Sequence, residues 1–149
     1  MKPRAASISI RKIFVDELVF KRNAEFSDKL QNVIFPFEFK KDTAYVKDSN
    51  HIICRIIARV EDKEGEKPLP FTFKVTMAGE FQVNDPNKTD IEILREISCP
   101  SILFPYLRET ISTITTKAGY PPLFIPTLNF AGDVECKDET PEQKKNSEK

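Results

Sequence analysis

The stretch CPSILFPYLRETISTITTKAGYPPLFIP, residues 99–126, decides the fold that we predict for this chain. Four of its apolar residues recur at spacings of four, four and three: Leu103, Leu107, Ile111 and Ile114. These spacings place them on one face of a helix. Gly119 stands where a left-handed C-terminal cap is expected, and the two prolines that follow cannot continue a helix. The stretch therefore predicts a buried helix up to Lys117, followed by an apolar loop.

Four segments that precede this helix alternate between apolar and polar residues, as β-strands do. They are residues 7–20, 33–45, 51–60 and 71–83. Consecutive strands with short connections favour an antiparallel meander. The fold class is therefore α+β, with a four-stranded antiparallel meander sheet packed by a long C-terminal helix near residues 91–117. The polar stretch 21–32 is expected to be a loop that crosses to the next strand.

Single residues refine this prediction. Pro36 lacks the donor that a central strand needs, so the second strand is expected at an edge of the sheet or to begin there. Gly79 indicates a bulge in the fourth strand. Thr89 with Glu92 three residues later is typical of a capping box at the start of the helix. In the first strand one parity carries these apolar residues: Ile8, Ile10, Phe14, Leu18 and Phe20.

The composition describes one domain with a sizeable core. The chain has 149 residues, 40% of them hydrophobic, and 12 are phenylalanine. Lysine plus arginine equals aspartate plus glutamate, 23 each, so no overall field favours nucleic acid. We expect a flexible N-terminus over residues 1–6, a folded domain over residues 7–131 and a disordered polar tail over residues 132–149.

The sequence does not indicate an enzyme or a metalloprotein. The three cysteines, Cys54, Cys99 and Cys136, are widely spaced, and the single histidine is His51, so neither a disulfide framework nor a zinc site is expected. Cys54 and Cys99 are expected to be buried structural thiols. There is no catalytic constellation or phosphate-binding loop, and no cofactor is predicted. No stretch reaches the ~20 apolar residues of a membrane span, so we expect a cytoplasmic protein.

A single helix covers a four-stranded sheet only in part, so apolar surface remains for a partner or a ligand. The rings of Phe35, Phe37 and Phe39 share one face of the second strand. They belong either to the core or to such a surface, and their parity does not separate the two.

Residues 99–130 resemble the SecB family of bacterial export chaperones, most specifically in the core ILFPYLRE over residues 102–109. Weaker similarity lies in Ile10–Phe14 and in the spacing of Phe71, Val75, Gly79 and Phe81. The resemblance implies an ATP-independent holding chaperone that keeps unfolded preproteins export-competent in hydrophobic grooves. It also implies a homo-oligomer, a dimer or a tetramer, in which the helix face lies at an interface or in the core.

By position, the resemblance implies a set of client-binding residues in the crossing loop, the second strand and the loop after the helix. They are Phe26, Leu30, Phe35, Phe37, Phe39, Tyr120, Leu123, Phe124 and Leu128. SecB proteins usually continue after this loop with a second amphipathic helix, whereas this chain turns polar after residue 131.

The resemblance also implies a face that docks the export motor SecA through acidic residues. At those positions this chain has Glu17, Lys21, Thr72 and Lys74, of which Glu17 alone is acidic. The alternative function is therefore a dedicated chaperone of one partner, such as an antitoxin, without transfer of clients to SecA. A third reading is a scaffold protein that keeps the fold without a client.

Overall fold

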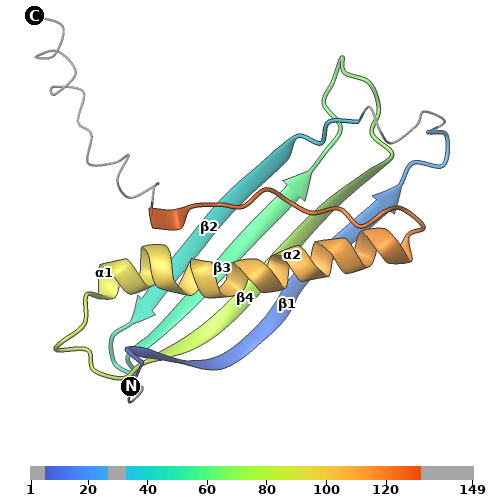
Figure 1. Cartoon of the computed structure of the whole chain (residues 1–149). Helices are drawn as coiled ribbons and strands as arrows, with labels where there is room; N and C mark the ends of the chain where they lie inside the picture. Colours follow the sequence, from blue (N-terminus) through green and yellow to red (C-terminus); the bar gives the residue numbers. More distant parts are fainter. Residues whose placement is uncertain (1–5, 27–32, 132–149) are drawn as a thin grey trace, which may run out of the picture.

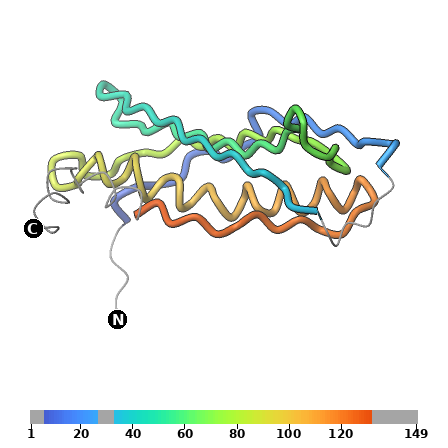
Figure 2. Tube along the Cα trace, turned by 90° about the horizontal axis from the view of Figure 1, so that it is seen from above, coloured from blue at the N-terminus to red at the C-terminus, as the bar shows by residue number. Residues whose placement is uncertain are grey.

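The computed structural model describes residues 6–26 and 33–131. Its strands are β1 (Ile8–Arg22), β2 (Phe37–Val46), β3 (His51–Val60) and β4 (Phe71–Val83). Its helical elements are the short helix α1 (Ile91–Ile93), the π-helical segment η2 (Leu94–Ser98) and the long helix α2 (Cys99–Lys117). Figure 1 shows α2 lying across one face of the sheet, and Figure 2 shows the sheet and the helix as two layers. The expected disordered tail, Cys136 within it, and the expected flexible N-terminus apart from Ala6 lie outside the described residues.

Within the described residues the sheet is four-stranded and antiparallel, in the order β1-β4-β3-β2. The meander is confirmed for β2, β3 and β4, but β1 pairs with β4 instead of β2. Because the connection after Arg22 crosses to the opposite edge, it separates two strands that a short turn would have paired. β2 is an edge strand that begins at Phe37, directly after Pro36, as the missing donor of proline predicted.

The alternation of β1 shifts twice along its length. Its register against β4 skips a residue between Ile10 and Lys12 and again between Val15 and Glu17. Each extra residue moves the following side chains to the other face. The apolar residues that face the helix are therefore Ile8, Ile10, Ile13, Val15, Leu18 and Phe20. Phe14, which pairs with Ala78, lies on the opposite face, so the single parity expected for this strand is wrong.

Two local predictions are also corrected. The register shifts lie in β1 and not at Gly79, which pairs in step with Ile13 and Cys54. A β-carbon at Gly79 would lie 2.8 Å from the Leu103 side chain and 2.7 Å from that of Phe81, so this glycine lets α2 approach the sheet. The helix is capped by Asp90, not by Thr89: the Asp90 carboxylate accepts hydrogen bonds from the N–H groups of Glu92 and Ile93.

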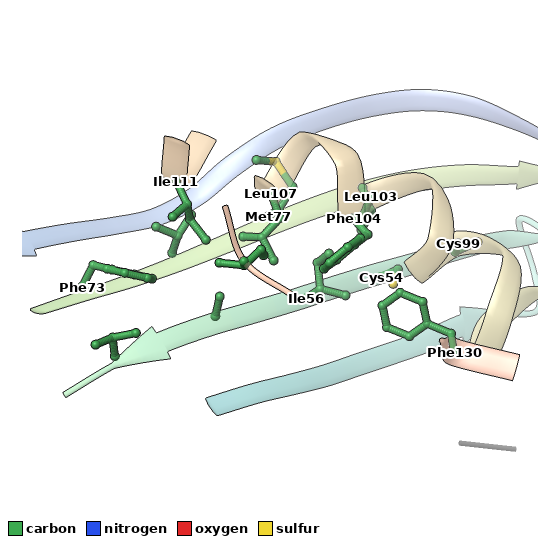
Figure 3. Packing of buried hydrophobic residues seen from close by; sticks show 14 of the residues in the cluster. Cys54, Ile56, Phe73, Met77, Cys99, Leu103, Phe104, Leu107, Ile111 and Phe130 are labelled. Atoms are coloured by element: carbon green, nitrogen blue, oxygen red, sulfur yellow. The ribbon is translucent and has the colours of Figure 1, made fainter. Parts of the chain in front are cut away.

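The core lies between α2 and the strands β3 and β4, where Figure 3 shows its side chains gathered. Leu103, Leu107 and Ile111 are fully buried there, as their spacing predicted, whereas Ile114 is half-buried. Cys54 and Cys99 are fully buried free thiols. Burial raises the pKa of each thiol to about 12, which keeps both protonated at neutral pH and fits a structural role. In the described part of the chain, no helix combines the length and the apolar character that crossing a membrane requires.

Candidate functional site

A continuous row of aromatic rings lies on the helix side of the sheet. Phe71 stacks on Phe35 at 4.8 Å between centroids and contacts Tyr120 at 4.9 Å, while Phe37 stacks on Phe39 at 6.0 Å. We call this the aromatic row: Phe20, Phe35, Phe37, Phe39, Phe71, Phe73 and Tyr120. Phe71 and Phe73 are buried, and the others are half-buried. The rings of β2 therefore pack against the core with one side and leave the other side accessible.

A cavity of about 190 Å³ continues the aromatic row at Phe39. It lies between β2, β3, α2 and the segment after α2, and its lining residues are Phe39, Lys40, Lys41, Ile56, Phe104, Leu107, Leu128 and Phe130. The Lys41 ammonium is paired with the Glu96 carboxylate at 2.7 Å, which fixes this side chain at the rim. The aromatic row and this cavity together form the apolar groove.

The segment after α2, residues 120–131, lines one side of the groove, and we call it the return segment. Figure 1 shows it running back along α2. The Leu123 N–H donates to Thr115 Oγ1 at 3.0 Å, and the Tyr120 hydroxyl donates to the Pro70 carbonyl at 3.1 Å. Ile125 is 1% exposed, whereas its neighbour Phe124 is 65% exposed. The segment is therefore held at a few positions and presents the residues between them to solvent.

The structure brings together most of the residues that the resemblance implied. Half-buried members at the groove are Phe35, Phe37, Phe39, Tyr120, Leu123 and Leu128. Phe26 is half-buried after the turn at Asn23, and Leu30 lies outside the described residues. Phe124 points away from the core.

Four residues of this region were missed by sequence reasoning: Phe104, Thr115, Ile125 and Phe130. Thr115 and Ile125 are buried, and Phe104 packs edge-on against Phe130 at 5.9 Å. Phe130 and Ile125 are visible in the sequence as apolar residues of the loop, but no regular spacing marks them as buried. Which apolar residues of the loop turn inward depends on where the segment contacts α2, and the local sequence does not specify this.

The four residues of the implied docking face lie together on the sheet face opposite the helix. Lys21 pairs with Thr72, and two register positions along, on the same face, Lys74 pairs with Val19. The Lys74 ammonium lies 3.2 Å from the Glu17 carboxylate, so the one acidic member of the set is neutralised by another member. Lys21, Thr72 and Lys74 line a shallow hollow of about 140 Å³.

A second apolar surface lies along β1. α2 packs on β3 and β4, and it leaves helix-facing residues of β1 exposed. Ile10, Val15 and Leu18 are between 40% and 51% exposed. β1 is also an edge strand, so its outer backbone groups and these side chains offer one continuous surface.

The chain is thus an antiparallel sheet that carries one long helix, with an open apolar groove and an exposed apolar edge, and these surfaces can accept another polypeptide chain. The family model of the preprotein translocase subunit SecB matches residues 2–133. The chain therefore belongs to the SecB family.

Individual relatives agree with this family. The protein-export protein SecB of Magnetococcus marinus is 31% identical over 132 residues, which cover 87% of this chain and 83% of that protein. The protein-export protein SecB of Methylobacillus flagellatus is 34% identical over 93 residues, 62% of this chain. The matched part spans 58% of the Methylobacillus protein, somewhat more than half its length.

A solved structure shares the fold. It is the SecB-like chaperone of Mycobacterium tuberculosis in complex with a ChAD peptide from the HigA1 antitoxin, with a TM-score of 0.67 and 18% identity. The match covers 83% of this chain and 91% of that one. At this identity the similarity establishes the α+β fold predicted from the sequence.

Proposed function

We propose that this protein is an ATP-independent holding chaperone that binds unfolded polypeptides in the apolar groove and keeps preproteins competent for export. No chemical step is involved, and no cofactor is required. Binding competes with folding and aggregation of the client, and release follows mass action or transfer to a partner. A chaperone of preproteins meets its clients before they leave the cytoplasm, and we place it there.

The observation that carries this proposal is the accessible aromatic row with its adjoining cavity, in a chain of the SecB family. The rings of Phe37 and Phe39 are ordered by contacts with each other, and Phe37 also contacts the buried ring of Phe73. A preorganised apolar surface binds an extended chain at a small entropic cost, and apolar contacts tolerate many sequences.

An aggregation assay tests the proposal. Several unrelated unfolded proteins are diluted from denaturant with and without the chaperone, and light scattering is followed. We expect suppression at equimolar or lower ratios for all of them. No suppression of any client would refute the holding function.

A second candidate is a dedicated chaperone of one partner, such as an antitoxin, that does not transfer clients to SecA. It is favoured by the face with Lys21, Thr72 and Lys74, where the only acidic member, Glu17, is neutralised by Lys74. A face of this charge weakens and slows the docking of a partner that reads acidic residues. Suppression limited to one client in the aggregation assay would support this candidate.

Titration with SecA at low salt tests the docking face separately. We expect weak binding, which improves when Lys21 and Lys74 are replaced by Glu. Affinity for the unchanged protein equal to that of an acidic SecB would contradict this expectation.

We also propose that the protein is a homo-oligomer, a dimer or a tetramer, that associates through β1 and α2. The exposed apolar residues of β1 are the surface that supports this, since isolated monomers seldom expose an apolar edge strand.

A further inference from the structure

The backbone groups of β2 that face away from the sheet can be assigned from the hydrogen bonds of its neighbours. The Val83 N–H donates to the Asn50 carbonyl at 2.8 Å, so the even-numbered residues of β3 bond to β4. In an antiparallel strand the N–H and C=O of one residue point to the same side and alternate along the chain. The odd-numbered residues of β3 therefore bond to the even-numbered residues of β2. The outward backbone groups of β2 belong to its odd-numbered residues: Phe37, Phe39, Lys41, Thr43 and Tyr45.

A side-chain contact supports this assignment independently. Arg95 Nη2 in η2 donates to the Thr43 carbonyl at 3.3 Å, which requires that this carbonyl is reachable from outside the sheet. The Lys41 ammonium also donates to the Glu96 carbonyl at 3.1 Å, so η2 covers this end of the edge. Among the described residues, nothing hydrogen-bonds to the outward backbone groups of Phe37, Phe39 and Lys41.

The uncovered part of the edge adjoins the apolar groove. The side chains of Phe37 and Phe39 lie on the helix face, in the aromatic row, and Phe39, Lys40 and Lys41 line the cavity. One short stretch of β2 thus offers backbone donors and acceptors at the edge and apolar side chains beside them. At ~3.3 Å per residue, five strand residues offer about 17 Å of edge.

We propose that an unfolded client segment joins the sheet as an additional strand along Phe37–Lys41, with every second side chain in the apolar groove. This proposal rests on the holding function and adds how the client is held. The occupant is an extended polypeptide segment with alternating apolar residues. The return segment, which lines the groove, has the same alternation, with Ile125 buried and its neighbour Phe124 exposed. Main-chain hydrogen bonds are the same for every sequence, which suits a chaperone with many clients.

Backbone methylation of a peptide tests the proposal directly. The probe is a short acetylated peptide of alternating leucine and threonine with lysine at both ends. One version is N-methylated on the leucines and another on the threonines. Because only one set of N–H groups can face the edge, we expect one version to bind about tenfold or more weakly than the other. Loss with methylated leucines indicates an antiparallel strand, and loss with methylated threonines a parallel one. Equal affinity of the two versions would overturn the proposal.

A pair of variants tests the same edge from the protein side. Phe39→Ala and Phe39→Pro both remove the ring, but proline also removes the outward N–H without breaking a bond to β3. We expect the proline variant to bind the unmethylated peptide several-fold more weakly than the alanine variant, with similar melting temperatures. Equal binding by two folded variants would overturn the proposal. If the proline variant does not fold, the methylated peptides decide.

The outcomes separate this proposal from the function on which it rests. If the two methylated peptides bind with equal affinity and the protein still suppresses aggregation, the holding function stands and strand addition is refuted. If the peptides do not bind and aggregation is not suppressed, strand addition and the holding function are both refuted. If Phe39→Pro lowers the oligomer mass relative to Phe39→Ala, a second copy of this chain occupies the edge, and the proposal is wrong.

Discussion

Thr115 is a completely buried polar residue of α2, and its side chain connects the helix to the return segment. Its hydroxyl donates to the carbonyls of Ile111 or Ser112, and it accepts the N–H of Leu123 at 3.0 Å. The hydroxyl thus serves as the hydrogen-bond acceptor that water would otherwise provide for the Leu123 N–H, close to the point where the chain reverses direction. Together with the Tyr120 hydroxyl and the buried Ile125 side chain, Thr115 therefore holds the return segment, and with it one side of the groove, in place.

We expect Thr115→Val to lower the free energy of unfolding by about 1–2 kcal/mol, because the Leu123 N–H loses its acceptor. Thr115→Ser is the matched control, since it keeps the hydroxyl. Amide hydrogen exchange at Leu123 separates the two variants: protection should fall in the valine variant and remain in the serine variant. Equal protection in both would show that another group satisfies this amide.

Gly79 is the second residue on which the packing depends, because it sets how closely α2 approaches β4. We expect Gly79→Ala to destabilise the protein by about 1–3 kcal/mol, since the new methyl group would lie within 3 Å of Leu103 and Phe81. Chemical denaturation measures the effect.

A double-mutant cycle with Leu103→Ala is the control for this prediction. Leu103→Ala alone should cost about 2–5 kcal/mol, because its side chain is fully buried. The cavity that it leaves has room for the Gly79 methyl group, so the double mutant should be more stable than the sum of the two changes predicts. Additive effects would contradict the close contact.

At the scale of the element, adjacent residues of the return segment have different roles: one packs in the core and the next is exposed to solvent. Ile125 anchors the segment in the core, and Phe124 stands in solvent. An exposed phenylalanine beside an apolar groove is available for a client, whereas a buried isoleucine is not.

We therefore expect Phe124→Asp to change stability by at most ~0.5 kcal/mol and to weaken binding of an unfolded client. Ile125→Asp is the matched change at the neighbouring position, and it should cost ~3 kcal/mol or more because it buries a charge. Thermal melting and fluorescence anisotropy with an unfolded client measure the two effects. Unchanged client affinity in Phe124→Asp would remove this residue from the site.

β2 is the other element that decides the groove. Phe37 is half-buried and contacts the core ring of Phe73, so Phe37→Asp should weaken client binding and also lower stability in part. This ring belongs to the core and to the groove at once, which is why its parity in the sequence did not assign it to either.

At the scale of the whole molecule, the two edges of the sheet differ in what they offer. β2 is partly covered by η2 and adjoins the groove, whereas β1 exposes helix-facing apolar residues along its length. We associate β2 with clients and β1 with self-association. This division leaves the groove free in an oligomer that forms through β1.

We expect Leu18→Lys to lower the oligomer mass measured by light scattering, because it places a charge in the apolar surface of β1. Val46→Lys is the matched control: Val46 is 41% exposed and Leu18 is 40% exposed, but Val46 lies on the sheet face opposite the helix, at the end of β2. An equal effect of the two changes, or an unchanged mass in Leu18→Lys, would argue against association through β1.

Local patterns in the sequence were enough to predict the strands, the helix and the buried face of the helix. Leu103, Leu107 and Ile111 were identified from helical spacing, the edge position of β2 from Pro36, and the buried state of Cys54 from strand alternation. These features depend on local periodicity and on the chemistry of single residues, which the sequence displays directly.

Features that depend on contacts between distant segments could not be predicted in this way. β1 lies beside β4, with two register shifts, because of its pairing with a strand far away in the chain. The need for glycine at position 79 comes from the approach of Leu103, and the burial of Ile125 comes from the packing of the return segment on the core. Strand order and register are set by which surfaces are buried together, and many pairings share the same alternation. The groove is likewise a product of β2, α2 and the return segment meeting, and none of the three encodes it alone.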